Sequence, residues 1–314
     1  MPNRAIAENP LDLLMWRASD LHRQGKWLYA AQIYRQITEE YPDHAPAWVY
    51  LAELYIARGQ YRAARDVLNG GLIECAGDVR LNLTLGNVYL EEGDFDRAVA
   101  CYRAVLNEDR GHPKALHNIG LAFARTGRNA EAIAYLTKLA YSRPDYPGLA
   151  ELLGGTYLAV GQIDRALNVL LPAEERDPDN ALLRYLAGLA FAGMERWAEA
   201  TQRLRRANAL KPDDAETMRA LGWALLKLRN HEEAEVWLRR AVDARPEFLF
   251  AHMNLAVLYL MSDRPDEGWE ALEQVRRLDP ENERLAAFMD RWNEAGELPD
   301  IAVIEGTYGT RRTN

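Results

Sequence analysis

The chain has 314 residues, of which 48% are hydrophobic and 27% are charged, and its formal net charge at pH 7 is −9. The negative charge argues against broad contact with nucleic acid, because phosphate binding needs a clustered positive surface. No stretch approaches the roughly 18 consecutive apolar residues that a membrane-spanning helix requires.

The first ten residues carry charged side chains and contain no long apolar core. Residues 1–10 are therefore predicted to be a short lead-in and not a secretory signal. Asn9 and Pro10 are typical of a helix start, with asparagine as the N-cap and proline at the first helical position. Without a signal or a spanning segment, we expect a cytoplasmic protein that does not insert into a membrane.

From Leu11 onward the sequence repeats every 34 residues without insertion. Residues 83–106, LTLGNVYLEEGDFDRAVACYRAVL, have apolar residues at three- and four-residue spacing on both sides of a break at residues 92–94. This pattern predicts two amphipathic helices joined by a tight turn. Eight such units are predicted to fill residues 11–281, approximately at 11–44, 45–78, 79–112, 113–146, 147–180, 181–214, 215–248 and 249–282.

Three columns of the repeat keep a constant character when each unit is numbered from its first residue. Columns 8 and 20 hold only glycine or alanine, and column 11 always holds an aromatic residue or leucine. Small residues let two helices approach closely, and the large residue fills the space between them. Proline is predicted to end the second helix of six units. These prolines are Pro42, Pro144, Pro178, Pro212, Pro246 and Pro280.

The chain resembles the tetratricopeptide repeat family over about residues 11–296. The resemblance is carried by the 34-residue period, by the small and large columns, and by residue sets within single units. One set is Leu85, Gly86 and Tyr102, and another is Leu221, Gly222, Trp223, Ala234 and Pro246. The resemblance implies an all-α fold in which eight helix hairpins stack into an α–α superhelix, or solenoid.

Two places depart from the repeat. Gly70 and Gly71 lie inside the second helix of unit two, where each glycine costs about 1 kcal/mol relative to alanine, so we expect a soft spot there. Pro172 lies inside the second helix of unit five and removes a backbone hydrogen bond, so we expect a kink or an early break. The bend has either no role or the role of a hinge between two halves of the solenoid.

The last part of the chain is predicted to close the stack. Residues 283–296 contain ERLAAFMDRWNEA, with Leu285, Phe288, Met289 and Trp292 on one face and charged residues on the other. This pattern predicts a capping helix that covers the apolar side of the last unit. Residues 297–314 lose helical periodicity and are predicted to be a tail, either disordered or docked.

The sequence carries no pattern that indicates catalysis or a cofactor. There is no phosphate-binding glycine loop, no H-E-x-x-H and no C-x-x-C, and the six histidines do not cluster at ligand spacing. Every repeat column already has a packing role, and no nucleophile, base and orienting residue stand together. We therefore expect no enzyme, no metal site and no cofactor.

By the resemblance, columns 2, 5, 6, 9, 12 and 13 of each first helix line the concave groove. In the early units these residues are polar with local positive charge, and in the late units they are aromatic and apolar. Alternatively, any one of them faces a neighbouring helix. The predicted peptide-binding groove comprises Arg80, Asn87, Lys114, His117, Asn118, Arg125, Tyr185, Leu189, Arg219, Trp223, Phe250, Met253 and Asn254.

An extended or helical peptide is predicted to lie in this groove. Apolar side chains on groove walls usually have a partner, which suggests anchors near Tyr185, Trp223 and Phe250. Lys114, Asn118 and Arg125 would orient the peptide. The leading hypothesis is thus a non-catalytic scaffold or adaptor that binds a protein or peptide segment.

Two alternatives remain. The first is a self-assembling structural protein, a homo-oligomer in which residues 297–314 dock into a neighbouring groove; the second is a regulatory subunit of a separately encoded enzyme. Family members that bind chaperone C-termini use a clamp of Lys and Asn residues, and Asn87 and Asn118 match two of its positions. Gly148 and Leu152 stand where its basic pair should be, so this clamp is broken.

Overall fold

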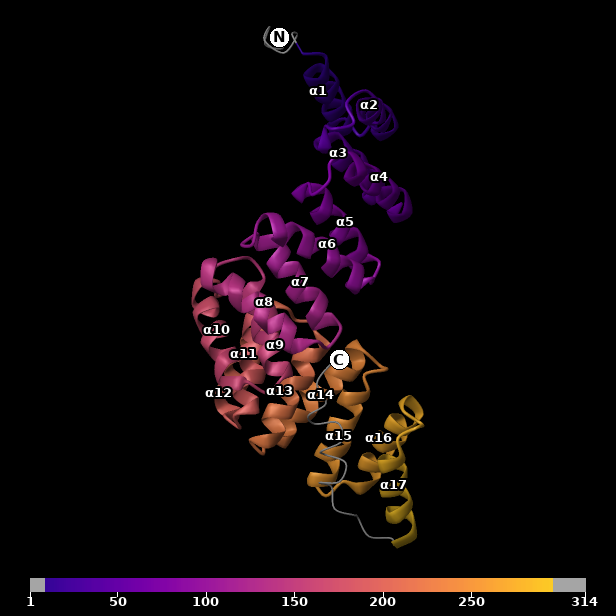
Figure 1. Ribbon diagram of the computed structural model, residues 1–314. Coiled ribbons are helices and arrows are strands. Elements are labelled where there is room, and N and C mark those ends of the chain that lie inside the picture. The colour runs from indigo at the N-terminus through magenta and orange to yellow at the C-terminus, as the bar shows by residue number, and fades with distance from the viewer. Residues whose placement is uncertain (1–8, 296–314) are drawn as a thin grey trace. The chain divides into compact units, whose positions relative to one another are not determined.

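The computed structural model describes residues 9–295, and within this range all regular structure is α-helical, in seventeen helices (Figure 1). The helices are α1 Pro10–Arg23, α2 Trp27–Glu40, α3 Ala45–Ile56, α4 Tyr61–Glu74, α5 Val79–Glu91, α6 Phe95–Glu108, α7 Pro113–Arg125, α8 Asn129–Ser142, α9 Leu149–Ala159, α10 Ile163–Arg176, α11 Ala181–Gly193, α12 Trp197–Leu210, α13 Ala215–Lys227, α14 His231–Ala244, α15 Leu249–Met261, α16 Pro265–Leu278 and α17 Glu283–Ala295. The predicted all-α fold is confirmed. The lead-in before Asn9 and the predicted tail lie outside the described residues.

The chain divides into two compact units, with the boundary after Leu149. We call residues 9–149 the N-terminal unit and residues 150–295 the C-terminal unit. In each unit the odd-numbered helices from α1 to α15, the first helices, pack against the even-numbered second helices that follow them. The longest described helix has 14 residues, and no described helix has both the length and the apolarity to cross a bilayer.

The small residue in column 8 is required by the close approach of the two helices in a hairpin. A Cβ atom added to Gly86 in α5 would lie 2.6 Å from the ring of Tyr102 in α6. A Cβ atom added to Gly222 in α13 would lie 2.6 Å from Cγ of Leu238 in α14. Contacts this short are well inside the normal separation of two carbon atoms. A larger residue at this position would therefore force the helices or side chains apart.

The turn inside each hairpin has a left-handed residue in column 15. Glycine occupies this position in the first five units, with φ between 70° and 77°. The last three units have Glu195, Arg229 and Asp263 there, with φ of 59°, 60° and 57°. Because a Cβ atom is disfavoured in this conformation, these three turns are strained and the glycine turns are not.

Gly70 and Gly71 in α4 have a packing role. The side chain of Trp48 lies against both: a Cβ atom would be 3.1 Å from the indole at Gly70 and 2.9 Å from Cβ of Trp48 at Gly71. The indole Nε1 also donates a hydrogen bond of 2.9 Å to the carbonyl of Pro42. The glycine pair therefore leaves space for a tryptophan between the two helices of the second hairpin, α3 and α4.

Pro172 does not end its helix. The expected early break is wrong, because α10 continues to Arg176 and has the same 14 residues as α8 and α12. Leu170 and Ala173 on either side are buried, whereas Pro172 is exposed. Neighbouring packing therefore holds the helix together, while the proline ring takes the solvent side. The boundary between the two units also lies at Leu149 and not at Pro172.

The predicted capping helix is present as α17. It packs against α16, and Leu285, Phe288 and Met289 are at most 2% exposed. The ring of Trp292 stands edge-on to that of Trp269 in α16, with centroids 5.2 Å apart. This helix covers the apolar side of the last hairpin.

Candidate functional site

We call the surface formed by columns 2, 5, 6, 9, 12 and 13 of the first helices the first-helix face. In the N-terminal unit its centre is a hydrogen-bonded cluster that joins two repeats. Oδ1 of Asn87 in α5 accepts a hydrogen bond of 2.8 Å from the hydroxyl of Tyr102 and one of 2.9 Å from Nδ2 of Asn118 in α7. Tyr102 is fully buried, and burial raises the pKa of its hydroxyl above the ordinary value. Two predicted groove residues, Asn87 and Asn118, are thus brought together.

His117 extends this cluster. Its Nδ1 lies 3.2 Å from Oδ1 of Asn118, and its ring packs on Tyr146 with centroids 5.3 Å apart. Its Nε2 is buried and has no hydrogen-bond partner among the described residues. His117 is therefore part of the wall of the face and is only partly accessible.

Charged residues from three hairpins share the same face. The pKa of Glu53 in α3 is raised because burial disfavours its charged form, while His22 in α1 and Lys114 in α7 oppose that shift. Charges interact through space, so His22 and Lys114 lie near enough to Glu53 to influence its ionisation. Three predicted groove cations are exposed and form no ion pair with a described residue. They are Arg80, Lys114 and Arg125.

Two aromatic residues on this face were missed by the sequence analysis. Trp16 in α1 and Tyr50 in α3 are 45% and 40% exposed. The ring of Tyr50 stacks on the buried ring of Tyr34, with centroids 5.6 Å apart, and burial raises the pKa of Tyr34 to about 12. Both exposed residues stand in column 6, which also contains the predicted groove residue Asn118. Their column number alone would therefore have identified them as groove residues.

In the C-terminal unit the predicted aromatic residues lie half-buried against the hydrophobic core. Burial raises the pKa of Tyr185 in α11, an effect that the nearby cation of Arg219 in α13 opposes. Nε of Arg219 lies 3.6 Å from Oε2 of Glu216, and its guanidinium stands 5.8 Å from the ring of Phe248. Phe248 in turn meets Phe250 edge-on, at 6.3 Å. Tyr185, Arg219 and Phe250 thus border a shared aromatic and cationic surface.

Trp223 and Leu189 complete the accessible part of the predicted groove in this unit. Both pack partly buried against the core. The ammonium of Lys227 lies 4.6 Å from the centroid of the Trp223 ring, a distance at which a cation is attracted to the ring face. Met253 and Asn254 in α15 behave differently, since they are only 1% and 2% exposed. These two predicted groove residues are therefore buried in this structure.

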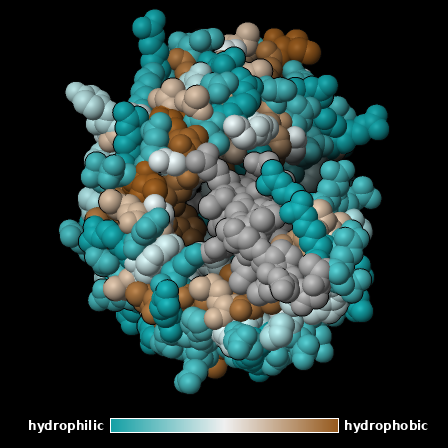
Figure 2. All heavy atoms as spheres, turned by 90° about the horizontal axis from the view of Figure 1, so that it is seen from below, coloured by the Kyte–Doolittle hydropathy of each residue, from teal (hydrophilic) through white to brown (hydrophobic). Residues whose placement is uncertain are grey.

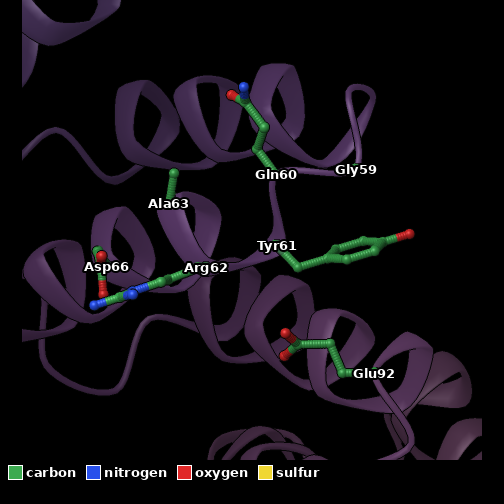
Figure 3. A pocket seen from close by; sticks show the side chains of 7 residues that line it. All are labelled: Gly59, Gln60, Tyr61, Arg62, Ala63, Asp66 and Glu92. Atoms are coloured by element: carbon green, nitrogen blue, oxygen red, sulfur yellow. The ribbon is translucent and has the colours of Figure 1, made fainter.

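Elsewhere the described surface carries hydrophobic side chains among hydrophilic ones (Figure 2). The cavity in Figure 3 lies beside the turn of the second hairpin, and Gln60, Tyr61 and Glu92 are among the residues that line it. Glu92 forms an ion pair of 3.4 Å with Arg65 and has no nucleophile beside it in this lining. Among residues 9–295 no three His, Cys, Asp or Glu side chains are grouped to hold a metal ion.

Comparison with known proteins gives two matching family models, both described as tetratricopeptide repeat. One matches residues 83–147, and the other matches residues 21–74, 123–189 and 191–248. The matched ranges together cover more than half of the chain.

Curated relatives match over shorter stretches. The photosystem I assembly protein Ycf3 of Prochlorococcus marinus subsp. pastoris is 32% identical over 90 residues, which are 27% of this chain and 52% of that protein. The BBSome complex member BBS4 of Bos taurus is 28% identical over 115 residues, which are 37% of this chain and 22% of that protein. The chain thus spans about half or less of the length of these relatives.

Solved structures share the fold. The Cut9–Hcn1 hetero-tetramer of the APC/C has a chain with a TM-score of 0.63 and 20% identity, over 95% of this chain and 57% of that one. YrrB, described as a TPR protein with an unusual peptide-binding site, gives a TM-score of 0.51 and 21% identity, over 60% of this chain and 96% of that one. At these identities the likeness concerns the fold alone.

Proposed function

Because the chain belongs to the tetratricopeptide repeat family, we propose that it is a non-catalytic scaffold that holds a segment of another protein on its first-helix face. The relatives support this direction: one is named an assembly protein, one a complex member, and YrrB is described as having a peptide-binding site. The more specific support comes from exposed residues on the first-helix face of this chain.

The first-helix face of the N-terminal unit carries the proposal. It combines two exposed aromatic rings, Trp16 and Tyr50, with the exposed cations Arg80, Lys114 and Arg125, which form no ion pair within residues 9–295. Large aromatic side chains bury apolar area at low entropic cost and are favoured anchors at interfaces. Unpaired cations attract a partner of opposite charge and fix its orientation.

This combination fits a partner segment with an apolar anchor and acidic residues beside it. The anchor would pack on Tyr50, and the acidic residues would face Lys114 and Arg125. The amide cluster of Asn87 and Asn118 lies between hairpins and would offer polar contacts to the partner's backbone. The proposed segment therefore binds through both burial and charge.

The experiment is affinity purification of partners with the full chain from its native host, followed by binding measurements with a purified partner. We expect Tyr50→Ala to weaken binding at least tenfold, and Lys114→Glu with Arg125→Glu to weaken it further and reduce its salt dependence. Ile73→Ala is the matched control, because Ile73 is 79% exposed but lies on second helix α4. Equal loss in the control, or less than twofold loss in the face variants, would contradict the proposal.

The first-helix face of the C-terminal unit offers the anchors Tyr185, Trp223 and Phe250. Met253 and Asn254 are not included, since they are buried. In the same assay we expect Trp223→Ala and Phe250→Ala to lower affinity if a partner uses this unit. A loss below about 1 kcal/mol in both variants would reject these anchors.

A further inference from the structure

The first-helix face of the N-terminal unit holds a carboxylate without a direct partner. Glu53, in column 9 of α3, is exposed and forms no ion pair or hydrogen bond within residues 9–295. Partial burial raises its pKa, and the nearby cations of His22 and Lys114 only oppose that shift. A carboxyl group whose pKa is raised in the folded state opposes folding when it is ionised. Stability of the fold therefore does not explain a glutamate at this position.

Two tyrosine side chains lie beside this carboxylate. Tyr50 precedes Glu53 by one helical turn in α3, so the two side chains lie on the same face of the helix. The ring of Tyr50 is 40% exposed and stacks on the ring of Tyr34 in α2. Burial, then the charges of Tyr50 and Glu53, raise the pKa of Tyr34 to about 12, which places its hydroxyl near the carboxylate. We call the surface formed by Tyr34, Tyr50 and Glu53 the Glu53 site.

The hydroxyl of Tyr34 differs from that of its equivalent in the third hairpin. Tyr34 and Tyr102 both stand in column 24. The hydroxyl of Tyr102 donates to Asn87 and accepts a hydrogen bond of 3.3 Å from Nδ2 of Asn118. Tyr34 forms no hydrogen bond within residues 9–295. The Glu53 site thus combines a carboxylate, a hydroxyl and an aromatic ring that the described residues leave without polar partners.

The C-terminal unit contains the same two kinds of side chain together with an arginine. Nη1 of Arg264 lies 2.6 Å from Oε2 of Glu235, and the guanidinium stands 4.5 Å from the centroid of the Tyr259 ring. The hydroxyl of Tyr259 donates to Oε1 of Glu235 at 3.3 Å. A guanidinium suits both neighbours, because it stacks on aromatic rings and donates paired hydrogen bonds to a carboxylate. At the Glu53 site no arginine of residues 9–295 takes this place.

We propose that the Glu53 site binds an arginine side chain of the segment held on the first-helix face. The guanidinium would donate to the carboxylate of Glu53 and to the hydroxyl oxygen of Tyr34, and the methylene stem would cover the ring of Tyr50.

This inference rests on the proposed function, and it identifies the apolar anchor on Tyr50 as the stem of that arginine. Lys114 lies near enough to influence Glu53, so the acidic residues that face Lys114 would stand close to the arginine in the partner. The partner segment would therefore carry an arginine with acidic residues beside it.

The test selects binders to the full chain from a library of short random peptides. With the wild-type chain we expect binders in which one arginine recurs beside acidic residues. Glu53→Gln should remove the preference for arginine and keep the preference for acidic residues. Glu39→Gln is the matched control, because Glu39 is also exposed without an ion pair or hydrogen bond within residues 9–295 but lies on second helix α2. It should keep both preferences.

One selected peptide then permits a double-mutant cycle. Replacing its arginine by citrulline, which keeps the shape and loses the charge, should weaken binding to the wild-type chain at least tenfold. The same replacement should weaken binding to Glu53→Gln less than twofold. Glu53→Arg should bind a peptide with glutamate in place of the arginine at least tenfold more tightly than the wild-type chain does.

Binders without a recurring arginine, or equal losses with citrulline on wild type and Glu53→Gln, would overturn the inference and leave the proposed function intact. Absence of any binder that depends on Tyr50, Lys114 or Arg125 would overturn the proposed function and the inference with it. Glu53→Gln keeps the side-chain volume and removes a charge that opposes folding, so it should fold as the wild type does, which circular dichroism would check.

Discussion

The two units use the same hairpin but differ in the polar contacts that join consecutive repeats. In the N-terminal unit a neutral cluster of Asn87, Tyr102 and Asn118 joins two repeats, and the ion pairs between repeats are 3.4 Å (Arg65 to Glu92) and 3.6 Å (Arg128 to Asp96). In the C-terminal unit the arginine–carboxylate pairs are shorter: Arg264 reaches Glu235 of the preceding repeat at 2.6 Å, and Arg203 reaches Glu174 at 3.3 Å. The repeat therefore fixes the backbone arrangement and leaves open which interactions join neighbouring units.

The turns differ in the same way. All four hairpins that lie wholly in the N-terminal unit turn on glycine, whereas three of the four later hairpins turn on a residue with a side chain. A left-handed non-glycine residue costs about 1 kcal/mol. The C-terminal unit thus combines strained turns with shorter ion pairs between repeats, and four matched pairs of substitutions would test this contrast.

The largest expected effect is at column 8. Gly86→Ala should destabilise the N-terminal unit by about 2–3 kcal/mol, because the new Cβ atom would meet the rigid ring of Tyr102. Gly222→Ala should cost about 1–2 kcal/mol, because Leu238 is a more flexible neighbour. Urea unfolding followed by circular dichroism would measure both. A larger loss for Gly222→Ala would show that ring rigidity does not decide the cost.

The second effect concerns tyrosine hydroxyl groups. Tyr102→Phe should cost about 1–2 kcal/mol, because it removes a donor from a buried amide cluster. Tyr259→Phe is the matched change in the C-terminal unit, where the hydroxyl meets the side chains of Arg239 and Glu235. Arg239 and Glu235 remain paired with each other at 2.8 Å when the hydroxyl is removed. The loss in free energy of unfolding for Tyr259→Phe should therefore be under about 1 kcal/mol. Equal losses would remove the distinction between the two networks.

The third effect tests the turns. Gly59→Ala should destabilise the protein by about 1 kcal/mol, although no atom lies within 4 Å of the added Cβ, because φ is 70°. Glu195→Gly should stabilise it by up to about 1 kcal/mol, because φ at that residue is 59°. Thermal unfolding would show opposite shifts in Tm. Shifts of the same sign would mean that side-chain contacts outweigh backbone strain at this column.

The smallest expected effect is on pH dependence, where two glutamates should act in opposite directions. Hydrogen bonding from Arg264 lowers the pKa of Glu235, so its contribution is present at neutral pH and is lost as the pH falls through the folded-state pKa. Burial raises the pKa of Glu53, so its ionised form opposes folding at pH 7 and this penalty disappears as the pH falls through the raised pKa.

Urea midpoints measured between about pH 7 and pH 3 would test this pair, since the ordinary pKa of a glutamate side chain lies in that range. Glu53→Gln should raise the midpoint at pH 7 and have no effect at the acidic end. Glu235→Gln should lower the midpoint at pH 7 and remove part of the acid sensitivity. Parallel behaviour of the two variants would contradict the assignment of opposite shifts.

Periodicity in the sequence was sufficient to predict most of the fold. Columns 8 and 11, the closing prolines and the capping face each follow from packing rules that act within one hairpin, so they are visible in the sequence. The behaviour of Pro172 was not predictable, because it depends on burial of Leu170 and Ala173 by neighbouring helices. The role of Gly70 and Gly71 likewise required the position of Trp48.

The candidate site was predicted less completely. Asn87 and Asn118 stand in columns 9 and 6, which these adjacent first helices place side by side. Exposure was harder, because it depends on what covers a position: Met253 and Asn254 are buried, while Trp16 and Tyr50 in equivalent columns are open. A repeat pattern identifies which face a residue belongs to and does not reveal whether that face is occupied.

Pro172 also shows what the stack does for its members. An excised peptide of residues 163–176 would be unstructured in water, because it is short and carries a proline at its tenth position. In the folded chain the same residues form a continuous helix. The helix at residues 163–176 is thus stabilised by packing against its neighbours and not by its own sequence. Substitutions on the solvent-exposed side of such a helix should therefore be tolerated, even when they lower its intrinsic helix propensity.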